Sequence, residues 1–231
     1  MPRNQIQFQK GMSLGTFQRH YGTEELEACF PNSPRLDRVT ASIKAKLLQL
    51  KKQKLNSISD LLGLEGGTAA PYFSLWKDLE IKWKGIKHQP IPDDWLAYTS
   101  RSTLAGGINI ENRHASHPVN AMLNYAYAAL YRFVLIDTIA HGYDPNIGVI
   151  YQKSHRSKRH DYVLDLMEPL RPEVDRAILQ LVHTETFAAN DFQLQADGVC
   201  RLNPQLARRV VQVVSAELGK PQVQTKAKAK A

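Results

Sequence analysis

The sequence predicts a mainly α-helical protein with little sheet, and three observations support this fold class. Apolar residues cover nearly all faces of the stretch 116–140, as they do in the central helix of a bundle. Ser33-Pro34 and Asn203-Pro204 each place a capping side chain before a proline, a pattern typical of helix starts. Only residues 192–202 have the pattern of a β-hairpin.

The first half of the chain is expected to contain three helical segments. The first opens with Ser33 as its N-cap and ends at Asn56, with apolar residues at helical spacing and lysines over much of the remaining surface. A second helix, residues 57–66, begins with a capping-box pattern. A third helical stretch covers residues 68–79, and residues 100–113 form a glycine-containing loop.

The second half is organised around the long helix, for which Gly142 provides the C-terminal stop. A further helix runs from Pro172 to about Thr184, whereas residues 162–164 are too short to assign. The hairpin over residues 192–202 turns at Asp197-Gly198.

The last helix runs from Asn203 to Pro221. After it, lysines alternate with alanines in a tail that is expected to be disordered. The sequence therefore predicts three parts: an atypical segment over residues 1–33, a helical domain over residues 34–218, and a basic tail over residues 219–231.

Charge favours a polyanionic partner. Thirty Lys and Arg against twenty-two Asp and Glu give a formal net charge of +8 and a pI of about 9.4, which suits nucleic acid or an anionic membrane surface. A basic protein without such a partner is the alternative. The longest apolar stretch, residues 119–140, contains Arg132 and Asp137 and is a poor membrane span. No signal peptide is recognisable, so a cytoplasmic location is expected.

Several enzyme classes are disfavoured by absent motifs. With two cysteines and no CxxC pair, the chain has neither a disulfide scaffold nor a cysteine-based zinc site. The sequence contains no P-loop, GxGxxG, GxSxG or HExxH pattern, which disfavours nucleotide binding, a hydrolase triad and a zinc protease.

Three acidic residues are candidates for chemistry. Glu65 lies between an apolar run and paired glycines; it is either a carboxylate that needs a partner or a surface residue at a helix end. Asp165 and Glu168 are three residues apart, which places both on one side of a helical turn. They are either a functional pair or acids that face a helix dipole.

A basic segment, residues 151–160, is a candidate DNA contact, because Lys and Arg commonly bind phosphates. A solvated surface loop is the alternative. The side chains concerned are Lys153, Arg156, Lys158 and Arg159.

Five stretches, taken in order, resemble the CRISPR-associated integrase that acquires spacers, and the resemblance extends over about residues 34–218. The stretches are residues 61–66, 112–127, 142–148, 165–175 and 200–202.

The resemblance implies a multi-helix catalytic domain with a Mn2+ or Mg2+ site. The family's metal-binding glutamate falls on Glu65, its closing acidic ligand on Glu168, and an accompanying carboxylate on Asp165. Oxygen ligands of this kind suit those cations. The implied activity is that of a DNA endonuclease and integrase of antiviral defence, which inserts a prespacer into a repeat. The implied partners are both DNAs, a second copy of the chain and the small second subunit of the adaptation complex.

The sequence departs from the family at the position of a metal-binding histidine. That histidine follows a glycine in a Gly-x-x-His pattern, and here Gly148 is followed by Tyr151 in the corresponding position. A phenol, with a pKa of about 10, is a poor substitute for a neutral imidazole. His155, four residues further on, is the alternative ligand. If neither serves, catalysis is expected to be weak or absent.

The front of the chain is the second departure. The family places a β-rich domain before the helical one, and residues 1–33 are too short to form it. Residues 7–25 resemble instead the N-terminus of certain insertion-sequence transposases. The leading hypothesis is therefore a truncated metal-dependent integrase and endonuclease. The alternatives are an inactive DNA-binding remnant and a helical interaction protein whose acids are structural.

Overall fold

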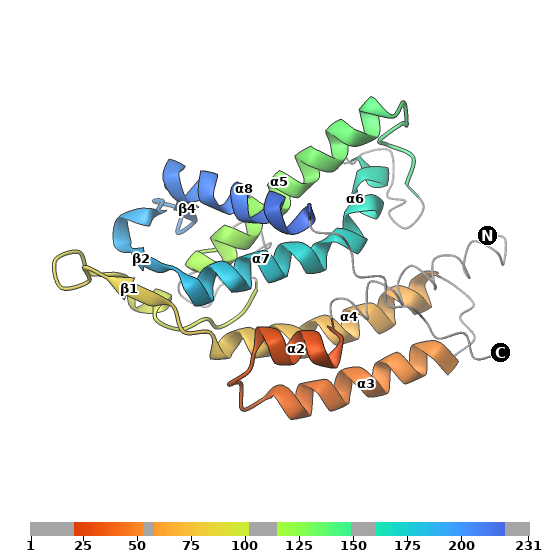
Figure 1. Ribbon diagram of the computed structural model, residues 1–231, viewed down its shortest axis with the longest axis horizontal. Helices are drawn as coiled ribbons and strands as arrows, with labels where there is room; N and C mark the ends of the chain where they lie inside the picture. Colours follow the sequence, from red (N-terminus) through yellow and green to blue (C-terminus); the bar gives the residue numbers. More distant parts are fainter. Residues whose placement is uncertain (1–20, 53–57, 102–114, 149–159, 220–231) are drawn as a thin grey trace.

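A computed structural model describes residues 21–52, 58–101, 115–148 and 160–219; at position 50 and over residues 58–66 it describes the backbone alone. The mainly α-helical fold class is confirmed (Figure 1). The α-helices are α2 (Thr23–Cys29), α3 (Leu36–Lys52), α4 (Ile58–Leu75), α5 (Pro118–Ala140), α6 (Asp161–Met167), α7 (Arg171–Thr184) and α8 (Pro204–Leu218). The short 3-10 helices are η1 (Trp76–Asp78), η2 (Asp93–Trp95), η4 (Glu168–Leu170) and η5 (Ala189–Asp191). The strands are β1 (Lys82–Lys84), β2 (Thr186–Ala188), β3 (Phe192–Leu194) and β4 (Cys200–Leu202).

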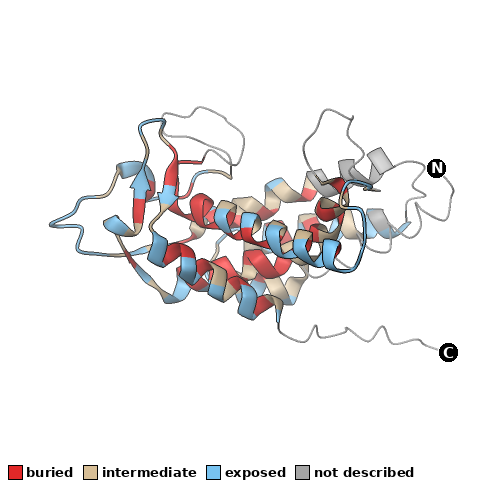
Figure 2. Cartoon of the chain, turned by 90° about the horizontal axis from the view of Figure 1, so that it is seen from above, coloured by how far each residue is buried: buried red, intermediate tan, exposed pale blue. Residues whose placement is uncertain are grey.

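The helices form two groups that meet along α7. Helices α2, α3 and α4 pack together on one side, and α5, α6 and α8 surround α7 on the other (Figure 1). Buried residues lie on the inner faces of the helices, whereas exposed residues lie on their outer faces (Figure 2). This division is expected for amphipathic helices around one core.

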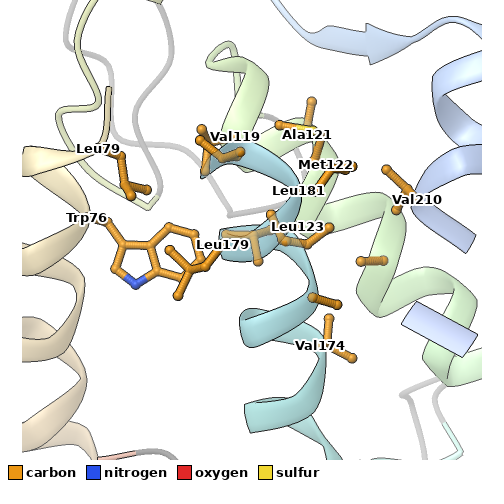
Figure 3. Close-up of a cluster of buried hydrophobic side chains, with 14 of the residues drawn as sticks. Trp76, Leu79, Val119, Ala121, Met122, Leu123, Val174, Leu179, Leu181 and Val210 are labelled. Carbon is orange, nitrogen blue, oxygen red and sulfur yellow. The ribbon is translucent and has the colours of Figure 1, made fainter. Parts of the chain in front are cut away.

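The core forms where the end of α4 meets the middle of the other group. Trp76 and Leu79 approach the buried side of α7, near Leu179, and apolar side chains of α5 and α8 complete the cluster (Figure 3). Trp76 and Val210 are fully buried. Burying a large apolar side chain stabilises a fold by roughly 1.5–3 kcal/mol, so this cluster holds the two helix groups together.

The structure corrects the predicted division between the second and third helical segments. Residues 57–66 and 68–79 were expected to be separate helices, but α4 continues through Gly66 and Gly67 to Leu75. A glycine in a helix costs only about 1 kcal/mol relative to alanine, and burial of Tyr72 and Leu75 in the core outweighs that cost. The Lys46 ammonium lies where a Cβ on Gly67 would be, so α3 approaches α4 closely at this glycine.

The start of α3 also differs from the prediction. Ser33 was expected to cap the helix, which begins instead at Leu36. The Ser33 hydroxyl donates to the Asp78 carboxylate at 2.5 Å. The same hydroxyl oxygen accepts a 3.2 Å hydrogen bond from the Arg35 backbone, in the turn before the helix. Local sequence did not predict the contact with Asp78, which comes from a distant part of the chain.

The predicted long helix is confirmed as α5. Its N-cap is His117, whose Nδ1 accepts a hydrogen bond of 3.3 Å from the backbone of Val119, and Gly142 follows its end with a φ of 76°. None of the helices in the described ranges is long and apolar enough to cross a membrane.

The helices and the hairpin after residue 170 are confirmed as well. Helix α7 has the predicted end at Thr184, and α8 is capped by Asn203, whose Oδ1 accepts from the Leu206 backbone at 2.7 Å. Strands β3 and β4 pair antiparallel, with Gly198 at a φ of 80° in the turn.

A short parallel pair, β1 with β2, was not predicted. Lys82 is opposite Thr186 and Lys84 opposite Ala188. Trp83, in β1, stacks on Trp95 with ring centroids 5.9 Å apart. Sequence patterns cannot detect this pair, because each strand has only three residues and lies about a hundred positions from its partner. The pairing connects the end of α4 to the end of α7.

Helix α2 packs into the same core. Leu26 is buried, and Phe30, directly after the helix, is buried beside Tyr72 and Trp76. Arg176 of α7 forms an ion pair with Glu25 of α2. Part of the segment 1–33 therefore contributes to the helical core, whereas the proposed boundary at residue 33 remains a prediction.

Candidate functional site

The two neighbouring candidate carboxylates lie where α6 passes into η4. Asp165 is the fifth residue of α6 and is 7% exposed, while Glu168 opens η4 with 30% of its side chain exposed. Their spacing of three places them on one side of consecutive turns, as the sequence predicted. One carboxylate is thus enclosed by protein and the other faces partly toward solvent.

Arg171, the first residue of α7, lies beside Glu168. Its Nε is 3.0 Å from Oε1 of Glu168, and its guanidinium carbon lies 5.0 Å from the centroid of the Tyr127 ring. A second guanidinium, that of Arg101, lies 5.9 Å from the same centroid and donates to Asn124 at 2.9 Å. Two cations therefore flank one aromatic ring of α5, an arrangement that the ring quadrupole favours.

Beneath this ring is a buried hydrogen-bond network that joins three helices. Asp175 of α7, 1% exposed, accepts hydrogen bonds from the phenols of Tyr72 in α4, at 3.0 Å, and of Tyr127 in α5. Burial raises the pKa of both phenols well above the ordinary value, and the Asp175 carboxylate raises it further. Both phenols therefore remain protonated donors to Asp175.

A further polar contact lies one turn along α5. The Tyr131 hydroxyl is 2.7 Å from Nδ1 of His160, and the two rings stack with centroids 6.0 Å apart. His160 immediately precedes α6, so this contact fixes the start of the helix that carries Asp165.

The other predicted site residues lie outside the described residues or have undescribed side chains. Glu65 belongs to α4, where its backbone alone is described. The candidates for the histidine position and for DNA binding fall in the undescribed range 149–159, namely Tyr151, His155, Lys153, Arg156, Lys158 and Arg159. Within the described ranges, no three His, Cys, Asp or Glu side chains form a group that could hold a metal ion. The structure thus brings together Asp165 and Glu168 and leaves the wider ligand set a prediction.

Sequence reasoning did not single out the polar residues that surround this pair. Glu168, Arg171 and Asp175 follow one another at intervals of three and four, which is helical spacing on one face. That signal was present in the sequence. Tyr72 and Tyr127 carried no comparable signal, because a tyrosine in an apolar helix is usually a core residue.

Comparison with known families identifies the chain. A family model described as "CRISPR associated protein Cas1" matches residues 13–215, most of the sequence. The chain belongs to the Cas1 family. The resemblance inferred from the five sequence stretches is therefore confirmed.

Among curated Cas1 relatives, the chain is similar to a Cas4 exonuclease/Cas1 endonuclease fusion of Geobacter sulfurreducens. The two are 31% identical over 156 residues, which is 67% of this chain and 25% of the fusion protein. The chain thus spans about a quarter of that relative's length.

Two solved structures share the fold. One is a casposase bound to an integration product, with a TM-score of 0.69, 22% identity, and coverage of 94% of this chain and 56% of that one. The other is a partial Cas6-RT-Cas1–Cas2 complex, with a TM-score of 0.63, 18% identity, and coverage of 90% and 56%. At these identities the similarity shows the helical fold alone. This Cas1 chain covers 56% of each of the two solved chains.

Proposed function

We propose that this Cas1 chain contains the helical catalytic domain of a metal-dependent DNA endonuclease and integrase that inserts spacers into a CRISPR repeat. The observation that carries the proposal is the common direction of α4 and α7, which supports an approach of position 65 in α4 to Glu168. Family membership supports the same function.

The alignment of the two helices follows from two contacts. Tyr72 of α4 binds Asp175 of α7, 103 positions later, and Lys82 pairs with Thr186 in the parallel strands, 104 positions later. Helices α4 and α7 both run toward the β1–β2 pair, which follows their C-terminal ends (Figure 1). The difference in residue number between contacting positions, 103 at Tyr72 and 104 at Lys82, is therefore almost constant over ten residues.

The same difference in residue number, applied toward the starts of the two helices, relates position 65 to Glu168. Position 65 lies seven residues, or two helical turns, before Tyr72, on the same face of α4. Glu168 lies seven residues before Asp175, in the 3-10 helix η4 that leads directly into α7. This register supports a centre built from Glu65 on one side and from Asp165 and Glu168 on the other.

The donor chemistry fits Mn2+ or Mg2+. Asp165 and Glu168 offer hard carboxylate oxygens from adjacent turns, and Glu65 would add a third carboxylate. When bound, the cation would polarise the scissile phosphate and stabilise the displaced oxygen. A ligand from residue 151 or 155 would complete the set, with His155 chemically better suited than Tyr151.

The cations near the carboxylates suit a phosphate substrate. Arg101 and Arg171 both lie near the Tyr127 ring, and Arg171 also contacts Glu168; the chain has a formal net charge of +8. Guanidinium groups recognise phosphates through planar, multiple hydrogen bonds. These residues would bind and orient a DNA backbone beside the carboxylates, aided by Lys153, Arg156, Lys158 and Arg159. No covalent protein–DNA intermediate is required, because positioning and charge neutralisation suffice.

Partners follow from the same proposal. The solved casposase holds an integration product, and the solved Cas6-RT-Cas1 protein is in complex with Cas2. We infer prespacer and repeat DNA as substrates, with a second copy of the chain and a small Cas2-like subunit as protein partners. Co-purification with a co-expressed Cas2 protein, followed by mass measurement of the complex, tests the assembly.

The test of activity is cleavage and strand transfer on labelled branched DNA with Mn2+. Glu168→Gln is expected to abolish the products, as is Glu65→Gln. Glu185→Gln is the matched control, since Glu185 lies at the other end of α7 in an exposed ion pair with Arg209, 2.9 Å long. Product formation that survives Glu168→Gln contradicts the proposal.

A second candidate function is DNA binding without cleavage, and Tyr151 in place of the family's histidine favours it. In that case, the chain binds branched DNA with steep salt dependence and forms no product. Tyr151→His then gains activity if the remaining ligands are in place. If the parent chain is active and His155→Ala abolishes its activity, His155 is the missing ligand.

A further inference from the structure

Arg171 is held between a candidate ligand and an aromatic ring. Its Nε lies 3.0 Å from Oε1 of Glu168 while its guanidinium carbon lies 5.0 Å from the centroid of Tyr127. A planar guanidinium that rests on a ring presents its nitrogens in a restricted set of directions. The ring therefore limits where Arg171 can meet the carboxylate.

Tyr127 is itself fixed from the other side. Its hydroxyl donates to Asp175, which is 1% exposed and also accepts from Tyr72. Moving the Tyr127 ring would break a hydrogen bond to a buried carboxylate, which is costly because the acceptor would lose a partner that water does not replace. A continuous chain of contacts thus leads from α4, through α7 and α5, to Glu168.

The strength of the Arg171–Glu168 pair does not explain this arrangement. Their side chains are 28% and 30% exposed, and partly exposed ion pairs contribute little to folding stability. What the contact does determine is the position of one carboxylate oxygen, since Oε1 lies 3.0 Å from the arginine Nε.

We propose that Arg171 and Tyr127 are positioning residues, which orient the Glu168 carboxylate for a divalent cation. The inference rests on the proposed metal-dependent function. Because the same contacts reach Tyr72 in α4, they also couple the orientation of Glu168 to the helix that carries Glu65.

The experiment measures Mn2+ affinity of the full chain by the loss of the free-ion electron paramagnetic resonance signal. Arg171→Lys keeps the charge and removes the planar guanidinium, so the field at the centre is nearly unchanged and only positioning is altered. We expect roughly ten-fold weaker Mn2+ binding, in the range seen when outer partners of metal ligands are replaced. The thermal unfolding midpoint should change little.

Two substitutions of Tyr127 provide a second test with graded effects. Tyr127→Leu removes the surface under the guanidinium and should weaken Mn2+ binding similarly, whereas Tyr127→Phe keeps the ring and should retain more of the affinity. If Tyr127 acts through Arg171, the double variant Tyr127→Leu/Arg171→Lys binds no more weakly than the weaker single variant. Tyr125→Phe, an exposed tyrosine of the same helix, is the matched control.

The outcomes separate the two proposals. If Glu168→Gln abolishes Mn2+ binding and Arg171→Lys matches the parent affinity, the positioning role is overturned and the metal centre stands. If Glu168→Gln leaves the affinity unchanged, the metal centre fails and the positioning role with it. Should Tyr127→Leu fail to fold, the partly exposed Arg171→Lys variant decides alone.

Discussion

The phenol of Tyr72 donates a 3.0 Å hydrogen bond to the carboxylate of Asp175, 103 positions away in the sequence. This contact is the polar connection between α4 and α7 on which the proposed alignment of Glu65 with Glu168 depends. It lies in the protein interior, where an ionised carboxylate persists only if hydrogen bonds replace its water.

Removing this hydrogen bond should destabilise the fold. We expect Tyr72→Phe to lower the free energy of unfolding by about 2 kcal/mol, because it removes a donor from a buried charged acceptor. Urea denaturation followed by circular dichroism gives the value. The exposed Tyr125→Phe should shift it by less than about 0.5 kcal/mol. Equal effects from the two substitutions would mean that Asp175 does not depend on Tyr72.

His117 should make stability depend on pH. Burial lowers its pKa to about 4, below the ordinary value of 6.5. The unfolded chain therefore binds a proton that the folded chain excludes, and stability falls as pH decreases from about 6.5 toward 4. The full effect is on the order of 3 kcal/mol.

His117→Asn isolates this effect. Asparagine can still cap α5 with its side-chain oxygen, and it does not titrate. Thermal unfolding midpoints measured between pH 7 and 4.5 should fall more steeply for the parent than for the variant. Parallel pH profiles would show that His117 titrates in the folded protein as it does in the unfolded one.

Gly67 should tolerate alanine, whereas Gly198 should not. Only the tip of Lys46, a flexible side chain, occupies the space of a Cβ on Gly67. We expect Gly67→Ala to stabilise the protein by about 0.5–1 kcal/mol, because alanine loses less backbone freedom in a helix. Gly198 has a φ of 80°, and Gly198→Ala should destabilise by roughly 1–2 kcal/mol. Both are measured by urea denaturation; loss of stability in Gly67→Ala would mean that Lys46 cannot move aside.

Arg176 should hold α2 and α8 to α7. It forms an ion pair with Glu25 and another, 3.1 Å long, with Glu217, whose side chain is 6% exposed. Arg176→Met should destabilise by about 2–3 kcal/mol, somewhat less than for a fully buried pair, because a buried charge loses its partner.

The added variant Glu217→Met should recover part of that loss, since it removes the buried charge as well. Hydrogen exchange of the α2 amides provides the local measurement. Unchanged protection of α2 in Arg176→Met would contradict the role of the Glu25 pair.

The local sequence signals predicted elements whose ends are determined locally. Helix α5 ends shortly before Gly142 and α8 begins after Asn203 because a positive φ and a capping side chain act within a few residues. Helix α7 was predicted from Pro172 in its first turn, which is also a local signal. The start of α3 was predicted too early: Ser33 accepts from the Arg35 backbone in the turn before the helix, and it also donates to Asp78, a partner that only the tertiary fold provides.

The candidate site, too, was predicted only in part from the sequence. Spacing predicted that Asp165 and Glu168 share one side of a helical turn, and the structure places them on consecutive turns; their role as ligands stays a prediction. The surroundings of the pair were not predicted, because Tyr127 and Asp175 reach them from separate helices through packing. Propensity and periodicity carry no information on which buried tyrosine meets which carboxylate.

The short parallel pair of β1 and β2 has a mechanical consequence for α4. Tyr72 is hydrogen-bonded to Asp175, and the strand that follows η1 pairs with β2, so this part of the chain is attached at two separate points. A helix attached at one point can change its angle, whereas attachment at two points fixes its direction. The direction of α4 relative to α7 is therefore determined near its C-terminal end, by Tyr72 and by the strand that follows η1.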